Sequence, residues 1–278
     1  MSPDPTSTHV QIDGPASSLS VLHPPLVLVH GVGLDLSMWD LVASDLASDR
    51  VVVRYDLWGH GGSLNPVGDL TVSDLVAQCR WVLHEAFSVS GTTPDLVGLS
   101  LGGLVGLATA ARHSAAVGRL VVMNTTFNRT EEELRGSRDR LALAETEGLE
   151  PVASLAIDRW FAPEWQDAHP GRVAMVRDRL ASNDLDAYLK AYRLFVDGDP
   201  DMPSAASRIT SATLALTGEL DAGSTPSMSR AIAAAVVNGR SLILSGLRHL
   251  PPIEAPEVCL AALREFLDVE VTIGMVEV

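Results

Sequence analysis

One serine of this chain stands where a nucleophile could work. Ser100 lies in the segment 98–103, Gly-Leu-Ser-Leu-Gly-Gly, which follows an apolar run and precedes a helix-like run from 101 to 112. A strand, a sharp turn and a helix in this order form a nucleophile elbow, in which the serine takes a strained backbone conformation. Gly98 and Gly102 leave the room for such a turn, because a Cβ at either position would meet the neighbouring chain. The pattern predicts that the Ser100 hydroxyl projects above a sheet as a nucleophile.

Two further polar residues complete a catalytic set in the chain order serine, acid, histidine. Asp221 follows the apolar run 212–216, and His249 follows the strand-like run 241–244. Loops at the ends of parallel strands are where sites form in open α/β sheets. We therefore predict that His249 takes the Ser100 proton as general base. Asp221 would hold the imidazole in the required tautomer and stabilise its cation.

Other interpretations compete for these roles. Glu219 stands two residues before Asp221, closer to the strand end, and a later loop position reaches the histidine more easily. Asn124 follows the strand-like run 118–123, another strand end at which an acid could stand, but an amide cannot carry the charge. His249 could be a loop histidine that caps a backbone carbonyl. Its place after a serine and an acid favours the catalytic interpretation.

A second loop is expected to bind the oxygen of a substrate carbonyl. The buried strand 26–29 runs into the segment 30–33, His-Gly-Val-Gly. Acyl transfer places negative charge on the carbonyl oxygen, and two fixed N–H groups there contribute several kcal/mol. We predict that the backbone N–H groups of Val32 and Leu101 form this oxyanion hole. His30 is interpreted as structural, with its ring holding the loop, rather than as a second base.

Apolar runs alternate with helical patterns through most of the chain. This alternation predicts an α/β fold with a doubly wound, mostly parallel sheet and right-handed crossovers. One helix begins with a capping-box-like segment at 71–74, and another has Pro226 at its first position after Thr225. We interpret 10–13 as the remnant of a first hairpin. The strand-like runs are 26–30, 51–55, 94–99, 118–123, 212–216 and 241–244.

One stretch breaks the alternation. From about residue 127 to residue 207 there are four helix-like segments and no strand pattern. We predict an all-helical cap over 127–207, inserted after the sixth strand, on a core made of 1–126 and 208–278. Such a cap would roof the site, exclude water and select the substrate. Trp160 is a candidate to line the pocket, and one inward arginine would bind a substrate carboxylate. The sequence does not single out this arginine among several in the cap, which include Arg129, Arg135, Arg138 and Arg159.

The chain resembles the α/β-hydrolase superfamily over nearly its whole length. The features that carry this resemblance stand in the family's order: His30-Gly31, the segment 56–63, the Ser100 turn, the Asp221 loop and His249. Within the superfamily the chain is most similar to the 3-oxoadipate enol-lactonase-like hydrolases. That narrower similarity lies in the segments 34–40, 54–56 and 159–163.

The resemblance and the triad together imply a serine hydrolase that works through an acyl-enzyme without a cofactor. The hypothesis for its substrate is a carboxylic ester or lactone of a small, anionic catabolic intermediate. An amide, or a C–C bond between carbonyl groups, stays an alternative; Leu250 follows His249, where the family's carbon–carbon hydrolases often carry a tryptophan. Two other classes stay open. Turnover would exclude a ligand receptor with an idle triad, and oxygen uptake or peroxide-dependent activity would reveal a cofactor-free oxygenase or perhydrolase.

Composition argues against several partners. The formal net charge of −15 over 278 residues disfavours nucleic-acid binding, which depends on cationic patches. No apolar run reaches the ~18 residues of a membrane span, and the first residues lack the pattern of a signal peptide. We therefore expect a cytoplasmic enzyme that acts on a small molecule, of unassigned oligomeric state. Cys79 and Cys259 stand on apolar helix faces as buried thiols and support neither a disulfide nor a metal site. The end 271–278 is interpreted as an edge strand or a loose end.

Overall fold

A twisted, mostly parallel sheet forms the centre of the protein in the computed structural model, which describes residues 4–15, 21–198 and 201–269. Its seven described strands follow the order β1-β3-β2-β4-β5-β6-β7. β1 pairs antiparallel with β3, and all other described pairs are parallel. This confirms the predicted doubly wound α/β fold. The strands are β1 (Val10–Asp13), β2 (Leu26–Val29), β3 (Val52–Tyr55), β4 (Asp95–Leu99), β5 (Arg119–Met123), β6 (Ala212–Gly218) and β7 (Gly239–Leu244).

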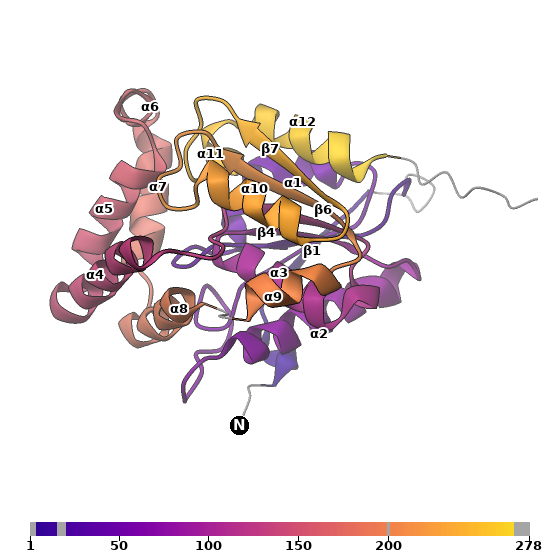
Figure 1. Ribbon diagram of the computed structural model, residues 1–278, viewed down its shortest axis with the longest axis horizontal. Coiled ribbons are helices and arrows are strands. Elements are labelled where there is room, and N and C mark those ends of the chain that lie inside the picture. The colour runs from indigo at the N-terminus through magenta and orange to yellow at the C-terminus, as the bar shows by residue number, and fades with distance from the viewer. Residues whose placement is uncertain (1–3, 16–20, 199–200, 270–278) are drawn as a thin grey trace, which may run out of the picture.

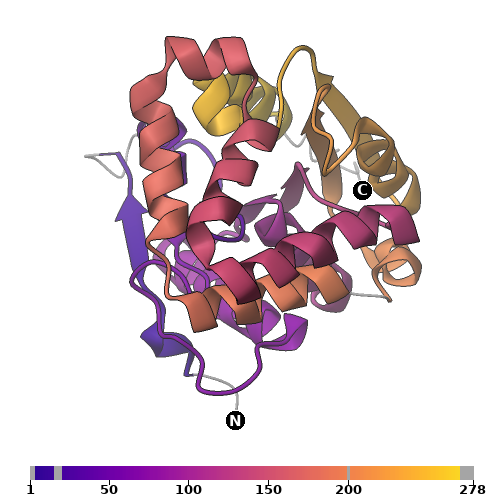
Figure 2. The same cartoon turned by 90° about the vertical axis from the view of Figure 1, so that its left-hand side faces the viewer.

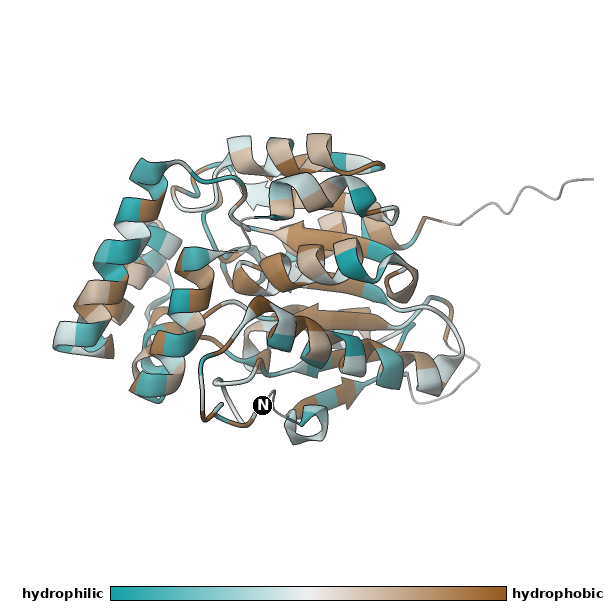
Figure 3. Ribbon diagram, turned by 60° about the horizontal axis from the view of Figure 1, so that its bottom comes forward, coloured by the Kyte–Doolittle hydropathy of each residue, from teal (hydrophilic) through white to brown (hydrophobic). Residues whose placement is uncertain are grey.

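Burial follows the apolar runs that predicted the strands. All residues of β2, β3 and β4 are buried, because helices cover both faces of the sheet and parallel strands bury both of their sides. The central strands are accordingly coloured mostly as hydrophobic residues in Figure 3. Their bounds agree with the predicted runs to within two residues. The prediction of an end segment at 271–278 lies outside the described residues.

Helices pack on both sides of this sheet. One face carries α2 (Val72–Ser90), α3 (Leu101–Arg112) and α10 (Pro226–Ala235). The other carries α1 (Asp40–Leu46) and α12 (Pro256–Leu267), which pack against each other (Figure 1). Within the described part of the chain, none of the helices combines the length and the apolar character needed to span a membrane.

The helix starts are set by side chains that the sequence predicts as caps. Thr71 and Asp74 form a reciprocal capping box at the start of α2, which satisfies backbone N–H groups that have no partner inside the helix. Thr225 caps α10 by accepting a hydrogen bond from the Met228 N–H.

The two cysteines, Cys79 in α2 and Cys259 in α12, are buried free thiols, as predicted.

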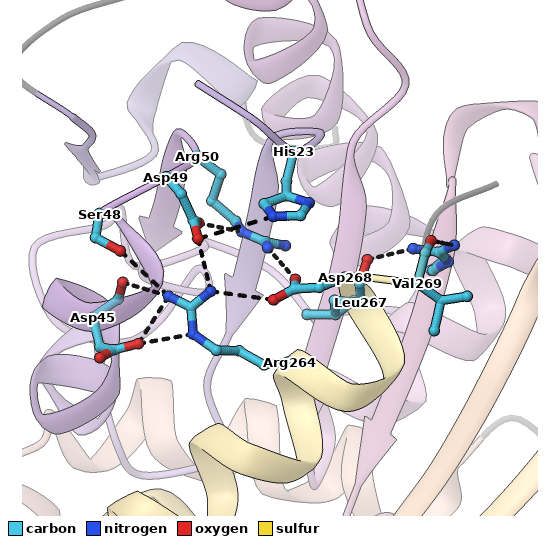
Figure 4. Close-up of polar contacts among 10 residues, drawn as sticks. His23, Asp45, Ser48, Asp49, Arg50, Arg264, Leu267, Asp268 and Val269 are labelled. Carbon is cyan, nitrogen blue, oxygen red and sulfur yellow. Dashed lines mark hydrogen bonds and ion pairs between the residues drawn. The ribbon is translucent and has the colours of Figure 1, made fainter. Parts of the chain in front are cut away.

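A cluster of charged residues fastens α12 to the loop between α1 and β3. Arg264 donates hydrogen bonds to Asp45 at 2.9 Å, to Asp49 at 2.8 Å and to Asp268 at 3.2 Å (Figure 4). The fully buried Arg50 pairs with Asp49 and Asp268 from the other side. Because these residues lie at the amino end of β3, the cluster stabilises the end of the sheet away from the strand termini that carry Ser100 and Asp221.

The chain between β5 and β6 carries helices and, in its described residues, no strand. These helices gather beyond one end of the sheet, at the left of Figure 1 and facing the viewer in Figure 2. The sequence predicts four segments here; among the described residues the structure adds two short α-helices, which begin at Pro163 and Met202. The helices are α4 (Glu131–Glu147), α5 (Leu149–Trp160), α6 (Pro163–Ala168), α7 (Pro170–Ala181) and α8 (Leu185–Asp197), with α9 (Met202–Ala205) leading back to β6.

The helices between β5 and β6 lie within the stretch 127–207 that was predicted as a cap, and the number of strands before them differs from the prediction. This stretch follows β5, the fifth described strand, rather than a sixth. The reason is that a single described strand, β1, stands at the beginning of the chain, where the count assumed a complete hairpin. β1 covers the segment 10–13 that was interpreted as the remnant of that hairpin.

Candidate active site

Ser100 lies in the sharp turn between β4 and α3. Its φ of 55° and ψ of −114° lie in a region that residues other than glycine rarely occupy, and the surrounding chain must hold this strain. A Cβ on Gly98 would collide with the carbonyl of Gly102, and a Cβ on Gly102 with the carbonyl of Val29. The two glycines therefore provide the room for the turn, as the sequence predicts.

His249 and Asp221 form a close, buried pair. His249 Nδ1 lies 2.6 Å from Asp221 Oδ2, and the exposed fractions of the two residues are 6% and 4%. Because a carboxylate only accepts hydrogen bonds, Nδ1 carries a proton, and in the neutral form of the ring Nε2 is then the nitrogen with the lone pair. The Trp160 ring stacks on the imidazole with centroids 5.6 Å apart. The pair thus fixes the tautomer that a general base requires.

Four donors surround the Asp221 carboxylate. Oδ1 accepts hydrogen bonds from the backbone N–H groups of Gly223 at 2.9 Å and Ser224 at 3.0 Å. Oδ2 accepts from Asn124 Nδ2 at 2.8 Å in addition to His249. Burial raises the pKa of Asp221, but the charge of His249 and these hydrogen bonds outweigh burial, so the pKa lies below its usual value. The residue is therefore ionised at neutral pH.

Ser100 and His249 meet at one cavity of about 210 Å³, which Val32 and Trp160 also line. Among the described residues, the Ser100 hydroxyl has no hydrogen-bond partner, and no hydrogen bond joins it to His249. The backbone N–H groups of Val32 and Leu101 are likewise without an acceptor among the described residues. The structure thus brings the predicted site residues to one region, where the Ser100 hydroxyl and these two N–H groups have no partner among the described residues.

Two buried histidines hold the loop that contains Val32. His30 Nδ1 lies 2.8 Å from the Gly31 carbonyl, while its Nε2 accepts from the Leu57 N–H at 2.9 Å. His60 Nε2 accepts from the Gly33 N–H at 3.0 Å, and burial lowers the pKa of His60 to about 3. Both rings are therefore neutral at physiological pH. Both nitrogens of His30 are engaged, which agrees with the structural interpretation of this residue.

The cavity has arginines on its helical side. Of the four that the sequence analysis considered, Arg129 and Arg159 line the cavity, whereas Arg135 and Arg138 are exposed on α4. Arg140 also lines it and was missed. No signal in the sequence singles it out, because helical spacing groups residues on a face and only the packing of α4 decides which face turns to the cavity. That face consists of Glu132, Glu133, Gly136, Ser137 and Arg140.

The three cavity arginines differ in their partners. Arg129 donates to the carbonyls of Phe195 and Val196, and Arg140 donates to the Tyr192 hydroxyl at 2.9 Å. Arg159 has no hydrogen bond or ion pair to any described residue. Burial and the neighbouring Arg140 lower the pKa of Arg159, although a guanidinium remains charged at any physiological pH. Arg159 is thus a cation near the pair of Asp221 and His249 that interacts electrostatically with Asp221 but has no hydrogen bond or ion pair of its own among the described residues.

Metal-binding side chains do not gather in the described part of the protein. No group of three His, Cys, Asp or Glu residues there could hold a metal ion.

Comparison with known proteins decides the family. A model described as the alpha/beta hydrolase family matches residues 26–262. The chain belongs to this family. The α/β hydrolase is 26% identical over 246 residues to (E)-2-((N-methylformamido)methylene)succinate hydrolase of Acinetobacter baylyi, covering 88% of this chain and 90% of that protein. It is 25% identical over 234 residues to 3-oxoadipate enol-lactonase 2 of the same species, covering 84% and 85%.

The structural comparison agrees with the sequence comparison. The crystal structure of the enol-lactonase from Burkholderia xenovorans matches this α/β hydrolase with a TM-score of 0.82 and 28% identity, over 94% of this chain and 96% of that one. The similarity to enol-lactonases that the sequence analysis stated is confirmed. The protein is an enzyme, a hydrolase of the esterase and lactonase kind.

Proposed function

We propose that this α/β hydrolase cleaves a carboxylic ester or lactone of a small, carboxylate-bearing molecule through a Ser100 acyl-enzyme. One observation carries the proposal: the strained Ser100 opens onto the same cavity as His249, whose Nδ1 is held 2.6 Å from Asp221. A serine, a neutral imidazole with a free Nε2 and an ionised carboxylate form a complete set for nucleophilic acyl transfer.

In the first half of the reaction the substrate acylates the serine. His249 Nε2 takes the hydroxyl proton while Ser100 Oγ bonds to the carbonyl carbon, and the carbonyl oxygen becomes an oxyanion. The N–H groups of Val32 and Leu101 donate hydrogen bonds to this oxyanion. The bond to the leaving oxygen then breaks, and that oxygen takes the proton from His249. Hydrogen bonds between nucleophile and base are often long without substrate, so Ser100 and His249 close on each other in the complex.

In the second half water releases the acid. His249 Nε2 takes a proton from water, and the water oxygen bonds to the acyl carbon, again with an oxyanion between Val32 and Leu101. When the bond to Ser100 Oγ breaks, His249 returns the proton to the serine. Asp221 stays ionised throughout and stabilises the imidazolium at each stage. For a lactone the leaving alcohol remains joined to the acyl group, so one product results.

Arg159 supports a substrate that carries a carboxylate. Its guanidinium lines the cavity of Ser100 and has no partner among the described residues, and arginine binds carboxylates through two parallel hydrogen bonds. Arg140 on the neighbouring wall adds positive charge. The name of the Acinetobacter baylyi succinate hydrolase states a substrate of this class for that relative.

The helices over 127–207 act as the predicted cap in this proposal. The Trp160 ring of α5 covers one face of the His249 imidazole. The Trp160 backbone carbonyl also accepts a hydrogen bond from the His249 backbone N–H at 3.3 Å. From the end of α7, Asn183 donates to the Gly33 carbonyl at 2.8 Å, next to the oxyanion donor Val32. The cap thereby contacts both the base and the oxyanion loop, and it excludes water from the reacting atoms.

Hydrolysis of p-nitrophenyl acetate and labelling by a fluorophosphonate test the proposal. We expect wild type to turn over and to label, and Ser100→Ala to do neither. Ser88→Ala is the matched control, because Ser88 is exposed on α2 and does not line the cavity of Ser100. A panel of lactones and esters, with and without a carboxylate, follows. A wild type that neither labels nor hydrolyses any of these substrates would contradict the proposed mechanism.

A further inference from the structure

Asn124 occupies an unusual position at the end of β5. It is fully buried, and its φ of 48° lies in the left-handed region, which asparagine tolerates better than most side chains. Its backbone N–H donates to the Leu216 carbonyl of β6 at 2.8 Å, so the residue is fixed between the two strands. Its side chain therefore points from one defined place toward the loops that follow β6 and β7.

The side-chain amide of Asn124 touches both of those loops. Nδ2 lies 2.8 Å from Asp221 Oδ2, 2.9 Å from the Arg248 carbonyl and 3.2 Å from Thr217 Oγ1. Asp221 Oδ2 is also the atom that binds His249 Nδ1. The Arg248 carbonyl belongs to the residue just before His249. The amide of Asn124 thus contacts the Asp221 carboxylate, the backbone next to His249, and Thr217 of β6.

The orientation of this amide follows from its partners. A carboxylate oxygen and a carbonyl oxygen both require a donor, so Nδ2 and not Oδ1 faces them. Oδ1 is buried and has no partner among the residues that the structure describes, an arrangement that is costly. The hydrogen bonds of Nδ2 are thus formed while Oδ1 stays unpaired, which indicates that the N–H donors of Asn124 are what matters at this position.

We propose that Asn124 is a positioning residue for catalysis. It fixes the Asp221 carboxylate and the His249 loop relative to each other, and its hydrogen bond weakens the attraction between that carboxylate and the imidazole. This inference rests on the proposed function, because it assigns a task within the same triad. A donor to Asp221 Oδ2 competes with the imidazolium for that oxygen. The amide therefore weakens the hold of Asp221 on protonated His249 and favours the neutral form that acts as base.

Other charged groups near His249 set the background for this effect. Glu254 of α11 (Pro251–Glu254) accepts the Arg248 N–H at 2.7 Å, and it interacts electrostatically with both Asp221 and His249. Arg248 adds a positive charge from the loop, and Arg159 adds one from α5. All of these groups stay in place when Asn124 alone is changed.

Two substitutions at Asn124 separate positioning from a merely structural role. Asn124→Gly removes the donor and keeps a backbone that tolerates the left-handed conformation. We expect kcat to fall about ten-fold, and the acid limb of the kcat/KM profile to move to higher pH. Asn124→Asp places a second carboxyl group beside Asp221, and two carboxyls at this distance share a proton. Loss of that proton adds negative charge next to the imidazole, so we expect the acid limb to rise by about one pH unit.

Asn128→Gly and Asn128→Asp are the matched controls. Asn128 also has a left-handed φ, of 51°, but it is exposed. We expect both controls to keep the wild-type profile. The low-field proton resonance of His249 Nδ1, assigned by its loss in His249→Gln, supplies a readout without turnover, and we expect it to shift in both Asn124 variants.

The outcomes separate this inference from the proposed function. Asn124 variants with lower thermal stability and lower kcat, but with an unchanged acid limb and an unchanged resonance, would overturn the positioning role. An inactive, unlabelled wild type would contradict the proposed function, while the His249 resonance in the same variants would still decide whether Asn124 controls the pair.

Discussion

Replacing Arg159 with glutamine tests how this hydrolase recognises its substrate. The change removes the one cavity guanidinium without a partner among the described residues and leaves a side chain of similar reach. A hydrogen bond to a charged group contributes about 1.5–3 kcal/mol. Because Arg159 is only partly buried, water screens part of this interaction. We therefore take about 2 kcal/mol as the binding free energy lost when the guanidinium is removed. That energy corresponds to a fall of about 30-fold in kcat/KM for a carboxylate-bearing substrate.

The assay compares two esters that differ in one charged group. The mono-p-nitrophenyl ester of glutaric acid carries a free carboxylate, and p-nitrophenyl butyrate does not. We expect Arg159→Gln to raise KM for the charged ester with little change in kcat, because the contact holds ground state and transition state alike. Hydrolysis of the neutral ester should change less than two-fold. Arg135→Gln, on the exposed side of α4, is the matched control.

Gly223→Ala provides a second, independent perturbation of the same contact. An added Cβ on Gly223 would collide with Arg159 Nη2, and the flexible end of the arginine would move rather than the backbone. This variant keeps the positive charge but displaces it, so we expect the same selective loss on the charged ester. Equal losses on both esters in Arg159→Gln, or no loss on either, would refute the assignment of Arg159 as the carboxylate anchor.

Three further predictions concern the triad, the turn and the sheet. Asp221→Asn removes the charge and the fixed tautomer of His249, and we expect kcat to fall by about 10⁴-fold in the ester assay while the thermal midpoint changes little; activity within ten-fold of wild type would contradict the role of Asp221. Gly98→Ala pushes a Cβ into the Gly102 carbonyl, and urea unfolding should show a loss of more than about 3 kcal/mol or no folded protein. Burial raises the pKa of Asp95 from 3.8 to about 6, so its stability contribution is present below pH 4 and is lost as pH rises through 6. Asp95→Asn should therefore gain stability over wild type between pH 4 and pH 7, by up to about 3 kcal/mol in urea melts, whereas a difference that does not vary with pH would contradict the shift.

Local sequence patterns predicted most of the fold. The continuous apolar runs predicted strands buried on both sides, and the capping box at Thr71 and the proline after Thr225 predicted where helices begin. These signals are readable because they act over a few residues, through backbone hydrogen bonds and side-chain periodicity. The pairing of β1 with β3 was not readable, since partners 40 or so residues apart in the chain leave no local pattern.

In the candidate site, too, some features could be read from the sequence and others depended on packing. The glycines around Ser100 and the chain order of Asp221 and His249 could be read from the sequence, because the turn and the strand ends impose residue types at fixed places. Which cap residues reach the cavity could not. Arg159 and Arg135 are alike in sequence terms, yet one lines the cavity and the other is exposed, because the packing of α4 and α5 decides which face turns inward.

The family, the order of the elements and the residue types at Ser100, Asp221 and His249 can be read from the sequence alone, because each depends on short-range patterns that the backbone must obey. The tertiary structure decided what those groups contact. Trp160 stacks on His249, Asn183 holds the Gly33 carbonyl, and Asn124 donates to the same oxygen of Asp221 as the imidazole. These contacts join residues far apart in the chain, and their geometry depends on how strands and helices pack in three dimensions.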